Sequence, residues 1–305
     1  MRDKLKSWNI LAGAGAAAAV AVLVLAGCLK DTGGTVERPS YIATIPPLTA
    51  ILREVVGERG DVTCLLSPGA SPHTYEPRPS DIELVEGAVG FFFAQKNLDA
   101  WALSFQQANR IEAFELVPED LRREMITHGH SHEGGHAPDG HFWTSPLTVK
   151  SALPGLVREL ARLDPEGSAE YEVNAERFAA DLTVLDDEVS AMLKPYTGEH
   201  LLLVHPSFLY FMADYGLELA GVVEPSPGKE PTPKSLSRLI EVARERDVKA
   251  IFTEPQLPEG PVRVLAEETG LPIYALDPLG GAPGRRTYSE LIRYNAKTVA
   301  EALGG

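Results

Sequence analysis

Residues 164–195, DPEGSAEYEVNAERFAADLTVLDDEVSAMLKP, decide how the chain is organised. Their apolar residues recur at alternating spacings of four and three, which places them on one face of an α-helix. Asp164 and Pro165 are typical of a helix start, and Pro195 is typical of a helix end. We therefore predict one helix of about 28 residues, roughly 40 Å long at about 1.5 Å per residue. The residues of this apolar stripe are Tyr171, Ala175, Phe178, Leu182, Leu185, Val189 and Met192.

Short apolar segments of β-type residues lie on both sides of this helix and alternate with helical stretches. Strands separated by helices are typical of βαβ units, in which the strands run parallel. We therefore predict an α/β fold with two lobes of mainly parallel sheet, residues 40–163 and 196–305, joined by the helix over 164–195. The alternative is that this helix is an ordinary core helix of one lobe. The expected strands are residues 41–45, 62–66, 91–94, 113–117, 200–204, 217–223, 248–252 and 272–276.

The first 27 residues have the pattern of an export signal. Arg2, Lys4 and Lys6 precede a small and apolar run that is shorter than the about 20 residues of a membrane-spanning helix. The run ends in Leu-Ala-Gly before Cys28, which resembles a bacterial lipobox. We therefore predict a lipoprotein signal peptide over 1–27, lipid on Cys28, a polar tether over 28–39 and an extracytoplasmic location at the cell membrane. An uncleaved N-terminal anchor is the alternative.

Charge and composition exclude other classes of protein. The chain has 28 Lys and Arg against 43 Asp and Glu, a formal net charge of −15, and no run rich in Lys or Arg. Such an acidic chain is a poor partner for the phosphates of nucleic acids. Beyond Cys28 the one remaining cysteine is Cys64, so no intramolecular disulfide can form in the exported protein. We expect a monomer that is held together by its hydrophobic core, with no nucleic-acid partner.

Five of the eight histidines fall between residues 128 and 141. Four of them belong to a glycine-rich loop over 127–140, and imidazoles on such a loop bind divalent transition metals loosely. His132, Glu133 and His136 also have the His-Glu-x-x-His spacing of zinc hydrolases, but the two glycines between them would undermine the required helix. A secreted zinc hydrolase therefore remains an alternative. The predicted loose metal loop consists of His128, His130, His132 and His136.

Four other positions are better placed for a tight metal site. His205 and Asp277 end two of the expected strands, which is where open α/β sheets place their ligands. His73 lies just beyond another expected strand, and His141 leads into Phe-Trp-Thr-Ser-Pro. Three imidazoles and one carboxylate complete a tetrahedral shell for Zn²⁺. With no vacant position for water, such a site would hold the metal without hydrolysing a substrate.

Longer motifs surround these four residues, among them PGASPHTYEPRPSD (68–81), NLDAW (97–101), HFWTSP (141–146), HPSFLYF (205–211), DYGL (214–217), EPTPKSL (230–236), IFTEPQ (251–256) and LDPLG (276–280), followed by Tyr288 and Asn295. Together they resemble the zinc-binding solute-binding lipoproteins of metal ABC importers, the ZnuA/TroA type, over roughly residues 40–303. The resemblance implies two Rossmann-like lobes joined by a long backbone helix, with the metal between the lobes. It also implies that His73, His141, His205 and Asp277 are the ligands, and that an ABC permease and its ATPase are the partners.

Two residues of these motifs call for separate expectations. The family usually has proline before the second histidine, whereas this chain has Gly140, so we expect the segment that carries His141 to be less fixed. Glu254 is an acidic residue in a motif that resembles the family's, and we expect it to support the ligands rather than to bind the metal.

The donor types favour zinc as the metal. Manganese-binding relatives carry a carboxylate where this chain has His205, and imidazole favours zinc over an ion that prefers oxygen. The resemblance thus implies a non-enzymatic protein that captures Zn²⁺ as its transported ligand and delivers it to the permease. The alternatives are a manganese-binding homologue of the same transporter class, a secreted zinc hydrolase, and a surface adhesin or zinc buffer without a transporter.

Overall fold

Two parallel four-stranded sheets form the frame of the part of the chain that the structure describes. This structure is a computed structural model, and it describes residues 38–125, 138–225, 228 and 230–304. The first sheet has the order β2-β1-β3-β4 and the second β6-β5-β7-β8, and every strand pair is parallel. The predicted α/β fold is therefore confirmed. The strands are β1 Ser40–Ala43, β2 Asp61–Cys64, β3 Gly90–Phe93, β4 Arg110–Glu112, β5 His200–Leu203, β6 Glu218–Val222, β7 Ile251–Thr253 and β8 Ile273–Ala275.

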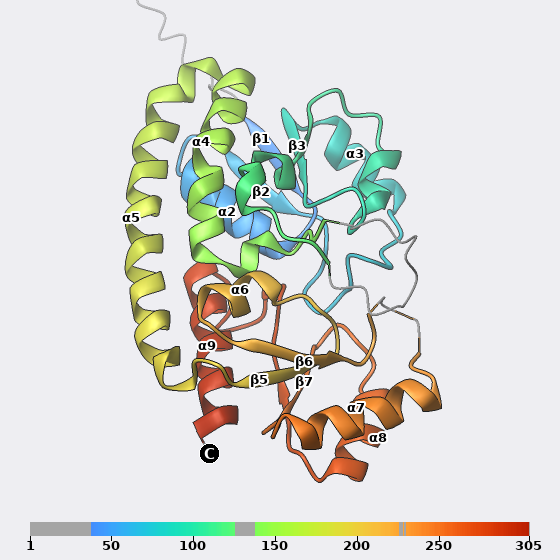
Figure 1. Cartoon of the computed structure of the whole chain (residues 1–305). Coiled ribbons are helices and arrows are strands. Elements are labelled where there is room, and N and C mark those ends of the chain that lie inside the picture. The colour runs from blue at the N-terminus through green and yellow to red at the C-terminus, as the bar shows by residue number, and fades with distance from the viewer. Residues whose placement is uncertain (1–37, 126–137, 226–227, 229, 305) are drawn as a thin grey trace, which may run out of the picture. The chain divides into compact units, whose positions relative to one another are not determined.

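Helices connect and cover these strands, as Figure 1 shows. Proline occupies the first turn of several of them, where its fixed φ suits the helix and its missing N–H costs nothing. Ser145 and Thr232 cap two of these helices by accepting hydrogen bonds from the backbone N–H groups of Thr148 and Ser235. The α-helices are α2 Pro46–Val56, α3 Pro79–Glu86, α4 Pro146–Leu163, α5 Ser168–Leu193, α6 Leu209–Asp214, α7 Pro233–Glu245, α8 Gly260–Thr269 and α9 Tyr288–Gly304.

The long helix α5 joins the two lobes, as the sequence predicts. It has 26 residues and packs against α2 and α4 of the first lobe and against α9 of the second (Figure 1). Short 3₁₀ turns, η5 Pro165–Gly167 and η6 Lys194–Tyr196, flank it at the expected prolines. The predicted stripe is buried up to Val189, but Leu193 rather than Met192 is its last buried residue.

The fourth strand was predicted too late in the chain. The strand is β4, and the apolar segment that follows it forms the 3₁₀ helix η2 Ala113–Leu116. Phe114 and Val117 are buried there, and the pairing of β4 with β3 ends at Glu112. A short buried apolar run has the same composition in a β-strand and in a 3₁₀ helix, so hydrophobicity alone does not distinguish the two.

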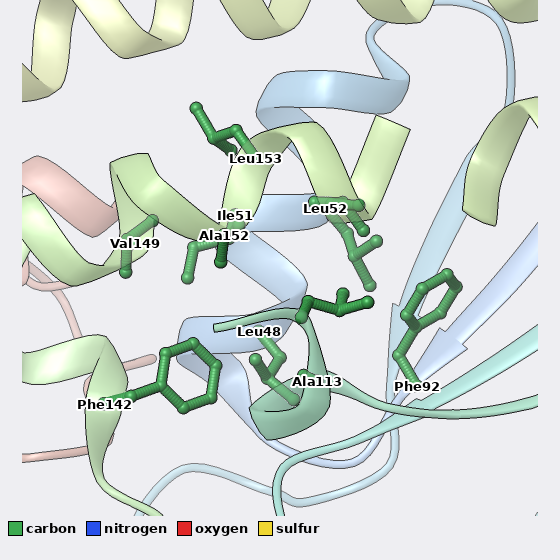
Figure 2. Close-up of a pocket in the computed structure, with 11 residues that line it drawn as sticks. Leu48, Ile51, Leu52, Phe92, Ala113, Phe142, Val149, Ala152 and Leu153 are labelled. Atoms are coloured by element: carbon green, nitrogen blue, oxygen red, sulfur yellow. The ribbon is translucent and has the colours of Figure 1, made fainter. Parts of the chain in front are cut away.

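The core of the first lobe contains a small apolar cavity (Figure 2). Its volume is about 30 Å³, and its lining includes Leu48, Phe92, Phe142 and Leu153. A dry cavity of this size has room for little more than one water-sized sphere and offers no polar partner. It is therefore a packing gap between α2 and α4 rather than a ligand site.

Several sequence predictions lie outside the described residues. They are the signal peptide, the lipid on Cys28, most of the tether, and the metal loop of His128, His130, His132 and His136. Among the residues that are described, no helix combines the length and the apolar character needed to cross a bilayer. Residues 38–305 form one compact unit, and the exact boundaries of the two lobes within it remain predictions.

Candidate metal centre

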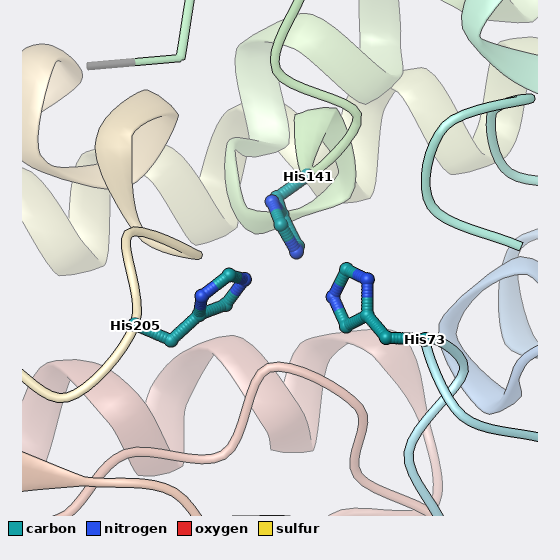
Figure 3. A group of neighbouring side chains, drawn as sticks. All are labelled: His73, His141 and His205. Atoms are coloured by element: carbon teal, nitrogen blue, oxygen red, sulfur yellow. The ribbon is translucent and has the colours of Figure 1, made fainter. Parts of the chain in front are cut away.

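Three histidines that are far apart in the sequence converge in the structure, as Figure 3 shows. His73 lies on the loop between β2 and α3, and His205 lies two residues beyond the end of β5. His141 directly precedes η4, the 3₁₀ turn Phe142–Thr144. The sequence predicted all three as metal ligands. His73 and His205 follow the carboxyl ends of parallel strands, one in each sheet, where α/β folds place their ligands, and His141 meets them from the segment before η4.

The geometry of the three imidazoles suits one ion. One donor nitrogen from each ring lies within 4.8 Å of the other two. The ring centroids of His73 are 5.9 Å from His141 and 5.2 Å from His205, and the remaining pair is 5.3 Å apart. Donors that bind one zinc ion at about 2.0–2.1 Å are roughly 3.3 Å apart. Small side-chain movements would therefore bring these rings into a zinc shell.

A small cavity lies beside the three rings. Its volume is about 10 Å³, and its lining includes the three histidines together with Glu254, Gln256 and Leu279. The Nε2 atom of His205 and the Oε1 atom of Gln256 are buried without a hydrogen-bond partner among the described residues. Unpaired buried polar atoms are costly, so two of them at one small cavity fit a site made for a cation.

Hydrogen bonds orient two of the rings toward this cavity. The Nδ1 atom of His141 donates to Oδ1 of Asp139 at 2.7 Å, and Nδ1 of His205 faces the carbonyl oxygen of Glu224 at 3.3 Å. Since both partners accept hydrogen bonds, each Nδ1 carries the proton and each Nε2 keeps its lone pair. This arrangement is typical of metal-binding histidines, whose second nitrogen is held by a carboxylate or a carbonyl group.

Burial keeps imidazoles of this cluster neutral. Desolvation, with a smaller contribution from His141, lowers the pKa of His73 to about 3. Desolvation also lowers the pKa of His205 well below its ordinary value, with smaller effects of His141 and His73. These rings are therefore uncharged at pH 7, which is the form that binds a metal.

Glu254 lies beside the histidines in a buried position. It lines the same cavity, is 6% exposed, and its Oε1 accepts a hydrogen bond from the Ser207 hydroxyl at 2.5 Å. Burial raises the pKa of Glu254 to about 8, so its carboxyl group is mainly protonated at pH 7. A neutral carboxyl is a weak metal ligand, which agrees with a supporting position, although that role remains a prediction.

Asp277, the predicted fourth donor, is not part of the histidine group. The structure places it two residues beyond the end of β8, almost fully buried, with its carboxylate bound to other partners. Its Oδ1 accepts from Gln256 at 2.9 Å, and its Oδ2 lies 3.2 Å from Nη1 of Arg285. In this arrangement Asp277 pairs with other groups, so its role as a metal ligand stays a prediction.

The segment around His141 has hydrogen-bond partners and close neighbours in the structure. Asp139 accepts hydrogen bonds from the backbone N–H of His141 and, at its carbonyl oxygen, from the Tyr210 hydroxyl. Gly140 is closely packed, because an added Cβ would lie 3.0 Å from Cβ of Gln95. Hydrogen bonds and close packing thus hold this backbone where a proline is absent, and the expectation that the segment is less fixed stays a prediction.

Sequence reasoning missed Asp139 and Arg285. The spacing of Asp139, two residues before His141, was the available signal, because a carboxylate so close can reach the imidazole. No sequence pattern pointed to Arg285, which meets Asp277 through a turn that follows β8. Both contacts depend on loop conformations that periodicity does not describe.

Hydrogen bonds tie η4 to the second lobe. The indole Nε1 of Trp143 donates to the carbonyl oxygen of Pro278 at 2.7 Å, and the Tyr288 hydroxyl donates to the carbonyl oxygen of Trp143 at 2.8 Å. Trp143 is fully buried, and its ring packs edge-on against His141. One tryptophan therefore connects a candidate ligand of the first lobe with the loop that follows Asp277.

The chain is similar to known metal-binding and metal-uptake proteins. The chain is 26% identical to the high-affinity zinc uptake system protein ZnuA of Bacillus subtilis over 300 residues, covering 92% of this chain and 94% of the relative. It is equally 26% identical to the manganese-binding lipoprotein MntA of Halalkalibacterium halodurans over 291 residues, covering 92% and 95%. A crystal structure of ZnuA has a TM-score of 0.76 and 28% identity, covering 87% of this chain and 98% of that one.

The family assignment follows from a match over most of the chain. Residues 42–302 match the family described as zinc-uptake complex component A, periplasmic. This is a family of transport components, which confirms that the chain is not an enzyme, and the secreted hydrolase gains no support. The chain belongs to the ZnuA family of metal-binding solute-binding proteins of ABC importers.

Proposed function

We propose that the chain captures one Zn²⁺ ion through His73, His141 and His205 and delivers it to an ABC permease. The observation that carries the proposal is the convergence of three imidazole donors, one from each of three distant segments. Asp277 is the proposed fourth donor, from the second lobe. The predicted lobes would then each supply two ligands, and any relative movement of the lobes would alter the shell.

Zinc rather than manganese is proposed because of the donors. Imidazole nitrogen suits zinc, whereas manganese prefers carboxylate, carbonyl and water oxygen. The relatives include both a zinc-uptake and a manganese-binding protein, so family membership leaves the metal open. A cluster of three histidines, with Glu254 mainly neutral beside it, favours the softer ion.

We further propose that the protein acts outside the cytoplasmic membrane as a lipid-anchored monomer. The signal-like residues before Cys28 and the periplasmic description of the family support this location. An anchored carrier remains beside the permease, to which it passes the ion when the donors cease to converge. The histidine-rich loop would raise the local zinc concentration without forming the tight site.

A metal titration of the purified full-length protein and of a variant lacking residues 128–136 tests this proposal. We expect one tight zinc site in both proteins, and we expect zinc to displace manganese when the two metals are supplied at equal concentration. Equilibrium dialysis with elemental analysis measures both quantities. Loss of the tight site with the loop would place the metal elsewhere, and displacement of zinc by manganese would reverse the assignment of the metal.

A further inference from the structure

The Asp277 carboxylate has partners for both of its oxygens. Oδ1 accepts from the backbone N–H groups of Leu279 at 3.1 Å and Gly280 at 2.9 Å, and from Nε2 of Gln256 at 2.9 Å. Oδ2 pairs with Nη1 of Arg285 at 3.2 Å. The Asp277 side chain is 3% exposed, so this ion pair is shielded on the carboxylate side. Oδ1 already has three donors, so a metal ion would bind at Oδ2, where it competes with the Arg285 guanidinium.

A tight turn places the Arg285 guanidinium against this carboxylate. The backbone N–H of Gly281 donates to the carbonyl oxygen of Arg285 at 2.8 Å, which closes the turn. Gly280 has a φ of +68°, and a Cβ there would lie 2.7 Å from the same carbonyl oxygen. The guanidinium carbon lies 4.4 Å from the ring centre of Tyr294, on whose face it stacks. Arg285 is therefore held in place by the turn and by the aromatic ring.

The same carboxylate is connected to the histidine cavity. The Nε2–H group of Gln256 donates a hydrogen bond to Oδ1 of Asp277, and Gln256 also lines the cavity beside His73 and His205. The main chain of Asp277 is fixed from the other side, because its N–H and C=O groups both bond to the Asn295 side chain at 2.8 Å. The backbone thus stays in position while the side chain has two alternative electrostatic partners, Arg285 and a cation at the histidines.

We infer that Arg285 is a competing cation that holds Asp277 in an ion pair away from the histidines, and that zinc binding exchanges this ion pair for a bond to the metal. The inference rests on the proposed function, since it takes Asp277 as the fourth donor. Two cations compete for one carboxylate, so Arg285 lowers the zinc affinity and speeds the release of zinc. Faster release of zinc suits a carrier that must pass its ion to a permease.

Substitution of Arg285 tests this inference in the full-length protein. We expect Arg285→Gln and Arg285→Met to bind Zn²⁺ about tenfold more tightly, which is the effect of removing one charged hydrogen bond, and to release it to a chelator correspondingly more slowly. If the glutamine variant folds poorly, Arg285→Met replaces it, because methionine retains an apolar side chain over the ring of Tyr294. The matched control is Arg286→Gln, which removes the same charge from a neighbour that interacts with Glu290 rather than Asp277. This control should keep the affinity of the unsubstituted protein.

A double-mutant cycle shows whether the effect passes through Asp277. In an Asp277→Asn background, Arg285→Gln should leave the zinc affinity and the release rate unchanged. Unchanged or weaker zinc binding by both Arg285 variants overturns the inference, as does an equal gain in the Asp277→Asn background. These outcomes differ from a failure of the proposed function, in which His205→Ala would itself retain the tight zinc site.

Discussion

Replacing His205 by alanine is expected to weaken zinc binding about 100- to 1,000-fold. Zinc sites built from four protein donors bind with about 10–16 kcal/mol, so each donor accounts for about 2.5–4 kcal/mol. The Nε2 atom of His205 is buried and has no hydrogen-bond partner among the described residues, and its Nδ1 makes a long hydrogen bond of 3.3 Å to the carbonyl oxygen of Glu224, so the substitution costs the metal-free protein little hydrogen bonding. The variant should therefore fold, and its metal-free form should keep the circular dichroism spectrum of the unsubstituted protein.

The histidine at the start of β5, the strand that precedes His205, provides the control. His200 begins β5 and lies five residues before His205 in the sequence. Its Nε2 pairs with the exposed Glu218 at 3.1 Å. His200→Ala should retain full zinc affinity in competition titrations against a chelating dye. Equal zinc affinity of His205→Ala and the unsubstituted protein would remove this histidine from the metal site.

Replacing Trp143 by alanine is expected to cause the largest loss of stability. Truncation of a buried tryptophan costs about 3–5 kcal/mol, and for a chain of this size the melting temperature should fall by roughly 6–20 °C. The variant also loses the hydrogen bond to Pro278 and the edge contact with His141, so zinc binding should weaken as well. Thermal unfolding of the metal-free protein, followed by zinc titration at low temperature, separates the two effects.

Trp101 is the matched control for this prediction. Its Nε1 also donates to a proline carbonyl oxygen, that of Pro72 at 2.8 Å, but the side chain is only partly buried. Trp101→Ala should therefore cost less stability than Trp143→Ala. Equal losses for the two variants would show that the contact between η4 and the second lobe contributes no special stability.

Regular patterns in the sequence predicted the elements that regular hydrogen bonding stabilises. The four-three spacing from Tyr171 to Val189 predicted α5, because a helix of this length must bury one continuous face. The two sets of short apolar runs predicted the parallel sheets, because strands that alternate with helices are typical of parallel βαβ units. The run over 113–117 was misassigned because Phe114 is buried equally well by a 3₁₀ turn.

The candidate site was predictable for its histidines and not for its charged neighbours. His73 and His205 lie in motifs that follow strands, and His141 begins a motif before η4, so the motifs marked all three as candidates. The Asp277 carboxylate pairs with the guanidinium group of Arg285, which lies in a turn closed by backbone hydrogen bonds. Such a contact is set by local loop geometry, which leaves no periodic trace in the sequence.

Zinc-edge anomalous diffraction from crystals of the zinc-loaded protein tests the central claim most directly. The account predicts one strong anomalous peak about 2.0–2.1 Å from a ring nitrogen of each of His73, His141 and His205. A strongest peak at any other place, or one bound by fewer than all three of these imidazoles, would contradict it.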